Sequence, residues 1–309
     1  MIKLAFLRFL ENLRNPFLDA FFSLITLFGE ETVFILLGIL FFWCVNKKQG
    51  YYLLSVGFIG IVINQFLKLC FRIERPWVKD KNFTIVEPAR EAATGYSFPS
   101  GHTQSSVGIF GGIARWNKNK VLRILLVALC VLVPVSRLYL GVHTPLDVGV
   151  SVIIALILIF VIYPIIYKGF ENKKVMRSLL LFMTVITVVF LLYVNLFNFP
   201  KDIDGENLQE GIKNAYKMLG CTLGIWFSYE LDSKFIKFDT KAPFFAQILK
   251  LVLGLIPLFA IKAGLKSPLY ALFGGSYFAD FIRYLLLVLF AGCIWPLTFK
   301  FFSKIGNRE

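Results

Sequence analysis

The hydrophobic and polar positions of this chain fall into long alternating blocks. Apolar runs long enough to form membrane helices recur over the whole length, and short polar connections separate them. An apolar helix of about 20 residues crosses a bilayer core, where lipid offers no hydrogen-bond partner to unpaired backbone groups. We therefore expect an all-α fold, a polytopic membrane helical bundle with about nine transmembrane helices. The predicted spans are residues 30–45, 51–71, 100–115, 121–140, 145–167, 175–197, 212–230, 244–265 and 277–301.

The first 29 residues have a different pattern. Residues 1–14 place apolar side chains on one helical face and charged ones on the other. This pattern fits a helix that lies in the membrane interface and equally one that packs on the protein. Residues 17–28 are apolar, but Glu30 and Glu31 separate them from the first predicted span. We expect residues 17–28 to form an interfacial segment or a half-helix.

Composition excludes an ordinary soluble domain. Hydrophobic residues make up 57% of the chain and charged residues only 17%, with 34 phenylalanines among 309 residues. Lipid is therefore the expected solvent for most of the surface. The five cysteines lie in or beside apolar runs without any C-x-x-C spacing, which predicts small buried side chains and neither disulfides nor a metal site.

The net charge of +14 would suggest a nucleic-acid partner in a soluble protein. Here the Lys and Arg residues fall mainly in short connections between apolar runs, so topology and contact with anionic lipids explain them better, and we expect no nucleic acid to bind. The basic short loops 46–50, 115–123, 168–177 and 234–250 lie on one side together with the C-terminus. The positive-inside rule predicts that this side is cytoplasmic.

Three polar clusters lie at the opposite ends of these spans. In the first, Lys68, Arg72 and Arg75 share one helical face, and Pro76 predicts that the helix ends there. Cations at a helix C-terminus interact favourably with the helix dipole without any further function. A guanidinium fixed at a rigid helix exit is also well placed to bind phosphate oxygens.

The second cluster is Pro99-Ser100-Gly101-His102, directly before an apolar helix. Ser100 is a suitable N-cap, Gly101 permits close backbone approach, and a helix N-terminus binds anions. A capped helix with a buried histidine is the simpler interpretation. The flanking lipid-spanning segments favour the interpretation as a functional site, because a polar cluster between such segments is energetically costly and is kept mainly where it has a function.

The third cluster contains Arg137, His143 and Asp147, spaced Arg-x5-His-x3-Asp. Thr144-Pro145-Leu146-Asp147 has the pattern of a helix N-cap, so Asp147 could serve only to cap the helix. Asp147 could also accept a hydrogen bond from the ring of His143 and make the other ring nitrogen a nucleophile. The two interpretations are compatible.

Together the clusters contain what phosphoryl transfer through a histidine requires. His143 has an orienting acid, His102 is a second imidazole that can act as a general acid, and several cations can stabilise phosphoryl oxygens. The three motifs, Lys68-x6-Arg75-Pro76, Pro99-Ser100-Gly101-His102 and Ser136-Arg137-x5-His143-x3-Asp147, resemble the signature of the type 2 phosphatidic acid phosphatase (PAP2) superfamily at every position.

That resemblance implies the role of each residue. His143 is the expected nucleophile, His102 the expected general acid, and Asp147 the residue that orients His143. The residues implied to bind the phosphoryl oxygens are Lys68, Arg75, Ser100, Gly101 and Arg137. The resemblance also implies a reaction that needs no metal or other cofactor, and an active site at the outer membrane face.

The resemblance is strong over about residues 30–167, and we expect residues 30–170 to form the catalytic helical core. Residues 1–29 are the expected N-terminal interfacial segment, and residues 171–309 the expected additional transmembrane helices, without an assigned role. Nine spans with an outward site are similar to the layout of glucose-6-phosphatase and sphingosine-1-phosphate phosphatases. The acidic loop 199–211 could cover the site, although a solvated loop is the simpler interpretation.

The sequence therefore predicts a multi-pass phosphatase of a bacterial cytoplasmic membrane, with the active site facing the periplasm or exterior and the C-terminus in the cytoplasm. The expected substrate is a phosphorylated lipid of the phosphatidic acid, sphingoid phosphate or polyprenyl phosphate type. A soluble sugar phosphate is the alternative within the same chemistry. A transporter or a lipid-binding protein is the alternative from a different class. A transporter should place charged residues near the span midpoints, whereas here they cluster at the span ends. The complete set of signature residues argues against a catalytically silent lipid-binding protein.

Overall fold

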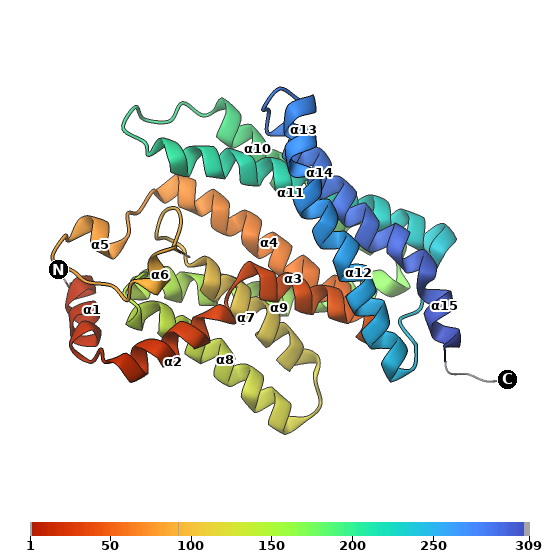
Figure 1. The fold of residues 1–309 in the computed structure, drawn as a ribbon, viewed down its shortest axis with the longest axis horizontal. Coiled ribbons are helices and arrows are strands. Elements are labelled where there is room, and N and C mark those ends of the chain that lie inside the picture. Colours follow the sequence, from red (N-terminus) through yellow and green to blue (C-terminus); the bar gives the residue numbers. More distant parts are fainter. Residues whose placement is uncertain (1, 92, 306–309) are drawn as a thin grey trace. The chain divides into compact units, whose positions relative to one another are not determined.

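A computed structural model describes residues 2–91 and 93–305, and all regular elements in these ranges are helices (Figure 1). The predicted all-α fold is therefore confirmed for the described residues. The chain forms two compact units. The first contains Met1–Leu37, Tyr52–Pro164 and Ile203–Leu208, and the second contains Gly38–Tyr51, Ile165–Asp202 and Gln209–Glu309. The predicted divisions at residues 29 and 170 stay predictions.

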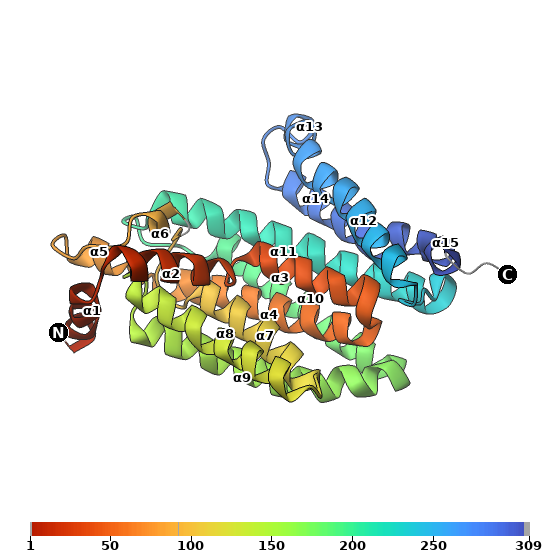
Figure 2. The same cartoon turned by 60° about the horizontal axis from the view of Figure 1, so that its bottom comes forward.

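The first unit carries all three motifs. Its helices are α1 (Ile2–Asn12), α2 (Pro16–Leu27), most of α3 (Glu31–Leu40), most of α4 (Lys47–Phe71), α5 (Pro76–Lys79), α6 (Pro88–Glu91), α7 (Gly101–Trp116), α8 (Lys120–Tyr139) and most of α9 (Pro145–Glu171). Helices α7 and α8 pack against each other, and α2 runs alongside α8 (Figures 1 and 2).

Local sequence signals set the boundaries of these helices. The Asn15 side chain accepts a hydrogen bond from the Leu18 N–H, with Pro16 at the first position of α2. Ser100 caps α7 in the same manner through the Thr103 N–H, as predicted, and Asn119 caps α8. After α8, Gly141 adopts a left-handed φ of 80°, which turns the chain before α9 begins.

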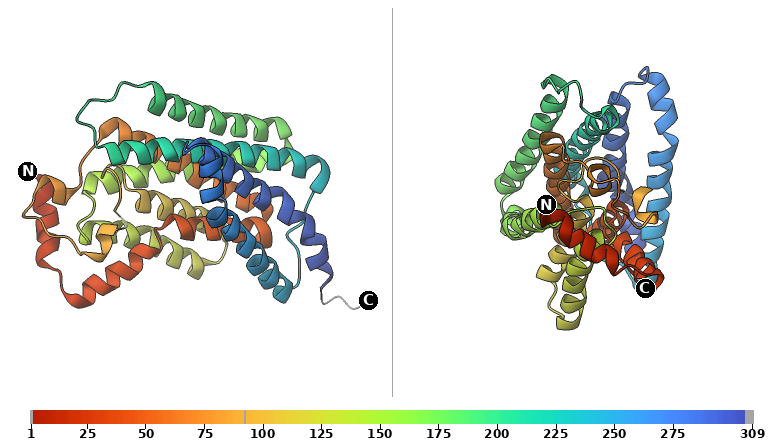
Figure 3. Two further views of the ribbon diagram at one scale, coloured as in Figure 1. Left: turned by 45° about the horizontal axis from the view of Figure 1, so that its top comes forward. Right: turned by 90° about the vertical axis from the view of Figure 1, so that its left-hand side faces the viewer.

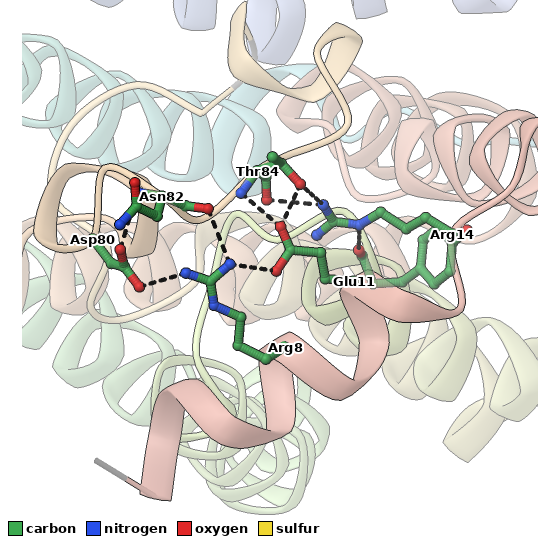
Figure 4. A network of polar contacts seen from close by, with 7 residues as sticks. Arg8, Glu11, Arg14, Asp80, Asn82 and Thr84 are labelled. Atoms are coloured by element: carbon green, nitrogen blue, oxygen red, sulfur yellow. Dashed lines mark hydrogen bonds and ion pairs between the residues drawn. The ribbon is translucent and has the colours of Figure 1, made fainter.

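Helix α1 packs on the protein, one of the two arrangements that its pattern allows. Leu7 is fully buried in a cluster with Phe83 and Ile85. Around it, Arg8 forms an ion pair with Asp80 at 2.7 Å, and Glu11 accepts a hydrogen bond from the Thr84 N–H at 2.8 Å (Figure 4). These contacts fix the loop that follows α5 against α1.

Six helices among the described residues are long and apolar enough to cross a membrane, or seven if one bent pair forms a single span. The bent pair is Pro16–Leu27 with Glu31–Val45, which meet at 45°. The predicted nine spans are therefore not confirmed. Helices α7 and α11 (Gly205–Leu231) exist at the expected places but fall outside this set, because α7 has only 16 residues and the first half of α11 is rich in polar side chains.

The second unit contains the C-terminal helices. They are η1 (Phe41–Val45), α10 (Lys173–Leu196), most of α11, η2 (Asp232–Ile236), α12 (Phe244–Gly264), α13 (Lys266–Leu272), α14 (Phe278–Leu289), η3 (Phe290–Ile294), η4 (Trp295–Thr298) and α15 (Phe299–Lys304). Helices α12 and α14 lie side by side and are joined through α13 (Figure 3). Gly220 and Gly224 of α11 face the backbone and side chains of α14, where a larger residue would clash. Small residues of this kind permit close helix packing in membranes.

Candidate active site

The loop between α8 and α9 presents His143. The backbone N–H groups of Val142 and His143 both donate to the carbonyl oxygen of Arg137, at 3.2 and 3.3 Å. Together with the left-handed Gly141, these bonds form a compact turn, and Pro145 starts the next helix directly after it. The imidazole of His143 is almost completely buried. The turn therefore fixes both the backbone and the side chain of this residue.

The two ring nitrogens of His143 face opposite charges. Nε2 lies 3.0 Å from Nη1 of Arg75, and Nδ1 lies 3.6 Å from Oδ2 of Asp147. A guanidinium can only donate hydrogen bonds, so Nε2 must accept and its lone pair points toward Arg75. The ring proton then sits on Nδ1, toward the carboxylate. This tautomer is the one that makes Nε2 a nucleophile.

The charge state of His143 follows from its surroundings. Burial lowers the pKa of His143 well below its ordinary value, and the nearby Arg75 and Arg137 act in the same direction, against a smaller opposite effect of Asp147. The imidazole is therefore neutral at neutral pH, as nucleophilic attack requires.

Asp147 has two structural functions at once. Its Oδ2 accepts a hydrogen bond from the Thr144 N–H at 2.7 Å, while Thr144 Oγ1 accepts from the Asp147 N–H at 3.4 Å, so the predicted helix cap exists. The same oxygen accepts from the Ser97 hydroxyl at 2.5 Å and lies beside His143. The other oxygen, Oδ1, is buried without a partner among the described residues. Capping therefore orients the carboxylate that faces His143.

Ser97 is a site residue that sequence reasoning missed. It lies outside the three motifs, and a serine in a loop two residues before a proline has many ordinary explanations. Its importance becomes visible only in the fold, where the Ser100 N–H also donates to the Asp147 carbonyl at 3.2 Å. The second and third motifs are thus joined through the side chain and backbone of Asp147.

The two cations of the first motif hold the loop that precedes α7. The guanidinium of Arg75 is buried and donates to the carbonyl oxygens of Thr94, Gly95 and Val142 at 2.6, 3.0 and 2.9 Å. Nζ of Lys68 donates to the Tyr96 carbonyl at 2.7 Å. Arg75 therefore has a fixed position beside His143, and Lys68 has one beside the loop that leads to the second motif.

Arg137 is fully buried and only partly hydrogen-bonded. Nη1 donates to the hydroxyl of Thr26 at 2.7 Å, whereas Nε and Nη2 have no partner among the described residues. Thr26 lies on α2 and was not predicted as part of the site. An unsatisfied buried guanidinium is costly, so its free N–H groups indicate a place for an anion.

The second motif completes the cluster. Ser100 Oγ accepts from the Thr103 N–H at 3.4 Å, and the site of a Cβ on Gly101 would lie 3.9 Å from Oδ1 of Asn64. Nε2 of His102 is buried and has no partner among the described residues. The ring of His102 lies close enough to interact electrostatically with Lys68, Arg75, Arg137 and His143.

All eight predicted site residues therefore meet in one cluster of the first unit, and their catalytic roles stay predictions. The cluster combines a neutral imidazole beside a carboxylate, a second imidazole and three cations, a set of groups that suits transfer of a phosphoryl group. Within the ranges that the structure describes, no group of three or more His, Cys, Asp or Glu side chains could hold a metal ion. The positive charge at the site comes from Lys68, Arg75 and Arg137.

Comparison with known families gives two matches. Residues 48–171 match the PAP2 superfamily, and residues 216–308 match the transmembrane extension of PAP2 superfamily phosphatases. The first segment contains all three motifs. The second lies in the part of the chain where the sequence offered no motif, so these C-terminal helices recur in other proteins.

Individual relatives match about half of this chain. A probable sphingosine-1-phosphate phosphatase of Dictyostelium discoideum is 31% identical over 160 residues, which cover 48% of this chain but only 38% of that protein. The undecaprenyl-diphosphatase BcrC of Bacillus subtilis (strain 168) is 32% identical over 151 residues, covering 48% of this chain and 75% of that protein. The crystal structure of Aquifex aeolicus LpxE matches with 27% identity and a TM-score of 0.48, over 53% of this chain and 96% of that one.

Proposed function

Because the chain belongs to the PAP2 superfamily and is a membrane phosphatase, a phosphoric ester hydrolase, we propose a specific reaction for it. The protein removes phosphate from a phosphorylated lipid, and the reaction passes through a phosphohistidine at His143. The observation that carries the proposal is the position of the His143 ring. Its Nε2 lone pair faces Arg75 at 3.0 Å, while its Nδ1 faces the carboxylate of Asp147. A phosphoryl group that enters between Nε2 and the cations would meet a nucleophile and its charge stabilisation together.

In the first step, Nε2 of His143 attacks phosphorus, an N–P bond forms, and the bond from phosphorus to the leaving oxygen breaks. His102 gives its proton to that oxygen, which leaves as a lipid alcohol or, from a diphosphate, as a lipid monophosphate. The positive charge that develops on His143 is stabilised by Asp147 at Nδ1. The 3.6 Å separation is long for a hydrogen bond, and such contacts often shorten only when substrate is bound.

In the second step, the now neutral His102 takes a proton from water as the water oxygen attacks phosphorus. The N–P bond breaks, its electron pair returns to Nε2, and inorganic phosphate leaves. Both histidines are back in their starting states. During both steps Arg75, Arg137 and Lys68, with the N–H groups at the start of α7, would stabilise the charge on the three equatorial oxygens.

A lipid substrate is supported by the position of the site and by the relatives. The three motifs lie in or directly adjoin the apolar helices α4, α8 and α9 and the short helix α7. A phosphorylated headgroup could reach the cluster while its hydrocarbon tails stay among the helices. The two relatives named above are called phosphatases for sphingosine-1-phosphate and undecaprenyl diphosphate, which share a phosphate on a long-chain lipid.

The outer face of the membrane is the proposed location of the site. The loops at the ends of the spans opposite the motifs are short and rich in Lys and Arg, which favours the cytoplasm for those loops. The C-terminus then lies in the cytoplasm, and the substrate reaches the enzyme from the outer leaflet. A bacterial cytoplasmic membrane is consistent with the Bacillus relative.

The experiment that tests this function is a phosphate-release screen with the purified protein. We expect hydrolysis of phosphatidic acid, a sphingoid phosphate or a polyprenyl phosphate or diphosphate, little hydrolysis of glucose 6-phosphate, and no loss of activity in EDTA. If the sugar phosphate is the better substrate, the lipid assignment is wrong, and if EDTA abolishes activity, the metal-free mechanism is wrong.

A membrane-impermeant phosphate ester should be hydrolysed equally by intact and lysed cells; activity only after lysis would contradict the outward orientation.

The substitution Asp147→Asn should change the pH dependence of the reaction. Protonation of His143 removes the Nε2 lone pair, so activity falls as the pH decreases through its pKa. Asp147 raises that pKa, against the lowering effects of burial and Arg75. Removing the carboxylate charge should therefore shift the acidic limb of the pH–rate profile to lower pH, and it should reduce the plateau rate by about tenfold to a hundredfold, because the ring is less well oriented.

Ser97→Ala is the matched control for this measurement. It removes one hydrogen bond to Oδ2 but keeps the carboxylate charge, so its acidic limb should not move to lower pH. A shift of the acidic limb to higher pH in Asp147→Asn would contradict the assigned interaction between Asp147 and His143.

A further inference from the structure

Helix α2 contributes to the candidate site although it precedes the segment that matches the family, residues 48–171. The hydroxyl of Thr26, in its last turn, is buried and accepts a hydrogen bond from Nη1 of Arg137 at 2.7 Å. This bond is the one hydrogen bond that the structure gives the Arg137 side chain within the described residues. The orientation of the guanidinium therefore depends on α2.

Several contacts hold α2 in place beside the last turn of α8. The Tyr139 hydroxyl donates to Oδ1 of Asp19 at 2.7 Å and accepts from the Asn15 N–H at 3.3 Å. Nε of Arg14 donates to the Tyr139 carbonyl oxygen at 3.1 Å. Arg14 also bonds to Thr84, in the network that fixes α1 (Figure 4). Helix α2, which carries Thr26, is thus bonded to Tyr139, two residues after Arg137.

The end of α2 also touches the second motif. Gly29 follows α2 directly, and a Cβ at this position would lie 2.9 Å from the Cβ of His102 and 3.0 Å from its carbonyl oxygen. Only glycine permits this approach. The break between α2 and α3 therefore lies against His102, while Thr26 reaches Arg137.

Which guanidinium nitrogen bonds to Thr26 decides which N–H groups of Arg137 stay free to bind an anion. A guanidinium has two edges that present a parallel pair of N–H groups, and the edge formed by Nε and Nη2 is suited to two oxygens of one phosphate. In Arg75 this edge is occupied, because Nε and Nη2 donate to Gly95 and Thr94. In Arg137 the same two atoms have no partner among the described residues, because Thr26 binds the remaining nitrogen, Nη1.

We propose that Thr26 is a positioning residue that holds the guanidinium of Arg137 with its Nε–Nη2 edge free for a phosphoryl group. This inference rests on the proposed function, because it assumes that Arg137 binds phosphate. Thr26 acts through Arg137 and does not touch the substrate. Helix α2 is consequently a part of the phosphate site and not only a membrane attachment.

The test compares Thr26→Val, which keeps the shape but removes the hydroxyl, with Thr26→Ser, which keeps the hydroxyl. Ser23→Ala, on the same helix one turn earlier, is the matched control. We expect Thr26→Val to lower kcat/KM for the best lipid phosphate by about tenfold or more and to weaken inhibition by vanadate by a similar factor. Thr26→Ser and Ser23→Ala should stay within about twofold of wild type in both measurements.

A second substitution separates positioning from general stability. In an Arg137→Lys background, Thr26→Val should cause little further loss, because its effect passes through the guanidinium. Multiplicative losses in the double variant, a Thr26→Ser variant as impaired as Thr26→Val, or a Thr26→Val variant equal to wild type would each overturn the inference.

Thermal stabilisation by inorganic phosphate gives a readout that does not depend on turnover. Phosphate should raise the Tm of wild type more than that of Thr26→Val. If wild type hydrolyses no ester but shows this Thr26-dependent stabilisation, the proposed function fails and the positioning role stands. If wild type is active through His143 and phosphate stabilises both proteins equally, the positioning role alone fails.

Discussion

Replacement of His143 by alanine should reduce phosphate release by at least about four orders of magnitude, to the rate of the assay background. The reason is that no other side chain among the described residues combines a neutral imidazole, an orienting carboxylate and an adjacent guanidinium. His102 does not replace it, because among the described residues no carboxylate contacts its ring and its Nε2 has no hydrogen-bond partner. Steady-state assays on the best lipid phosphate measure this effect.

The control for this variant is Cys130→Ala, which removes a partly buried side chain from α8 outside the site and should keep nearly full activity. The His143→Ala protein should remain folded, with a Tm close to that of wild type, because its loss of activity is chemical. More than a few per cent of wild-type activity in a folded His143→Ala protein would contradict the nucleophile assignment.

The substitution His102→Asn should reduce the rate with lipid substrates by about a hundredfold to a thousandfold. A lipid alcohol is a poor leaving group and needs a proton as the P–O bond breaks. The nitrophenolate of p-nitrophenyl phosphate leaves without one, so the first step with this ester should be much less affected. The first-step rate with p-nitrophenyl phosphate, divided by the first-step rate with a lipid phosphate, therefore reports general acid catalysis separately from substrate binding.

The comparison must follow the first step alone, because His102 also activates water in the second. A burst of nitrophenolate, followed by slow turnover, is the expected time course for His102→Asn with p-nitrophenyl phosphate. Equal losses with both substrates in the burst phase would mean that His102 binds the phosphoryl group or supports the fold and does not protonate the leaving oxygen.

The sequence predicted the parts of this molecule that depend on local signals. Apolar runs located the membrane helices α4, α8, α9, α10 and α12 closely, because the thickness of the bilayer sets their length. The caps at Ser100 and Thr144 follow from short-range hydrogen bonding. Motif spacing brought the eight site residues to neighbouring helix ends, and the structure places them in one cluster.

Contacts between distant segments were beyond the reach of sequence patterns. Thr26 and Arg137 are 111 residues apart, and Ser97 and Asp147 are 50 apart. A threonine in an apolar run and a serine in a loop have no distinctive pattern. The predicted number of spans is not confirmed for a related reason. Helix α11 is recognisable as a helix, but whether its polar half is buried among other helices or exposed to lipid depends on tertiary packing.

The most direct test of the central claim is to trap the phosphoenzyme. Wild-type protein mixed with a ³²P-labelled lipid phosphate and quenched in alkali within milliseconds should carry label on His143, stable to alkali and lost in acid. His143→Ala should carry none. With ³²P-labelled p-nitrophenyl phosphate, whose leaving group needs no proton, His102→Asn should accumulate more label than wild type because only its second step is slow. Turnover by wild type with no label at any quench time, or label in His143→Ala, would contradict a phosphohistidine at this residue.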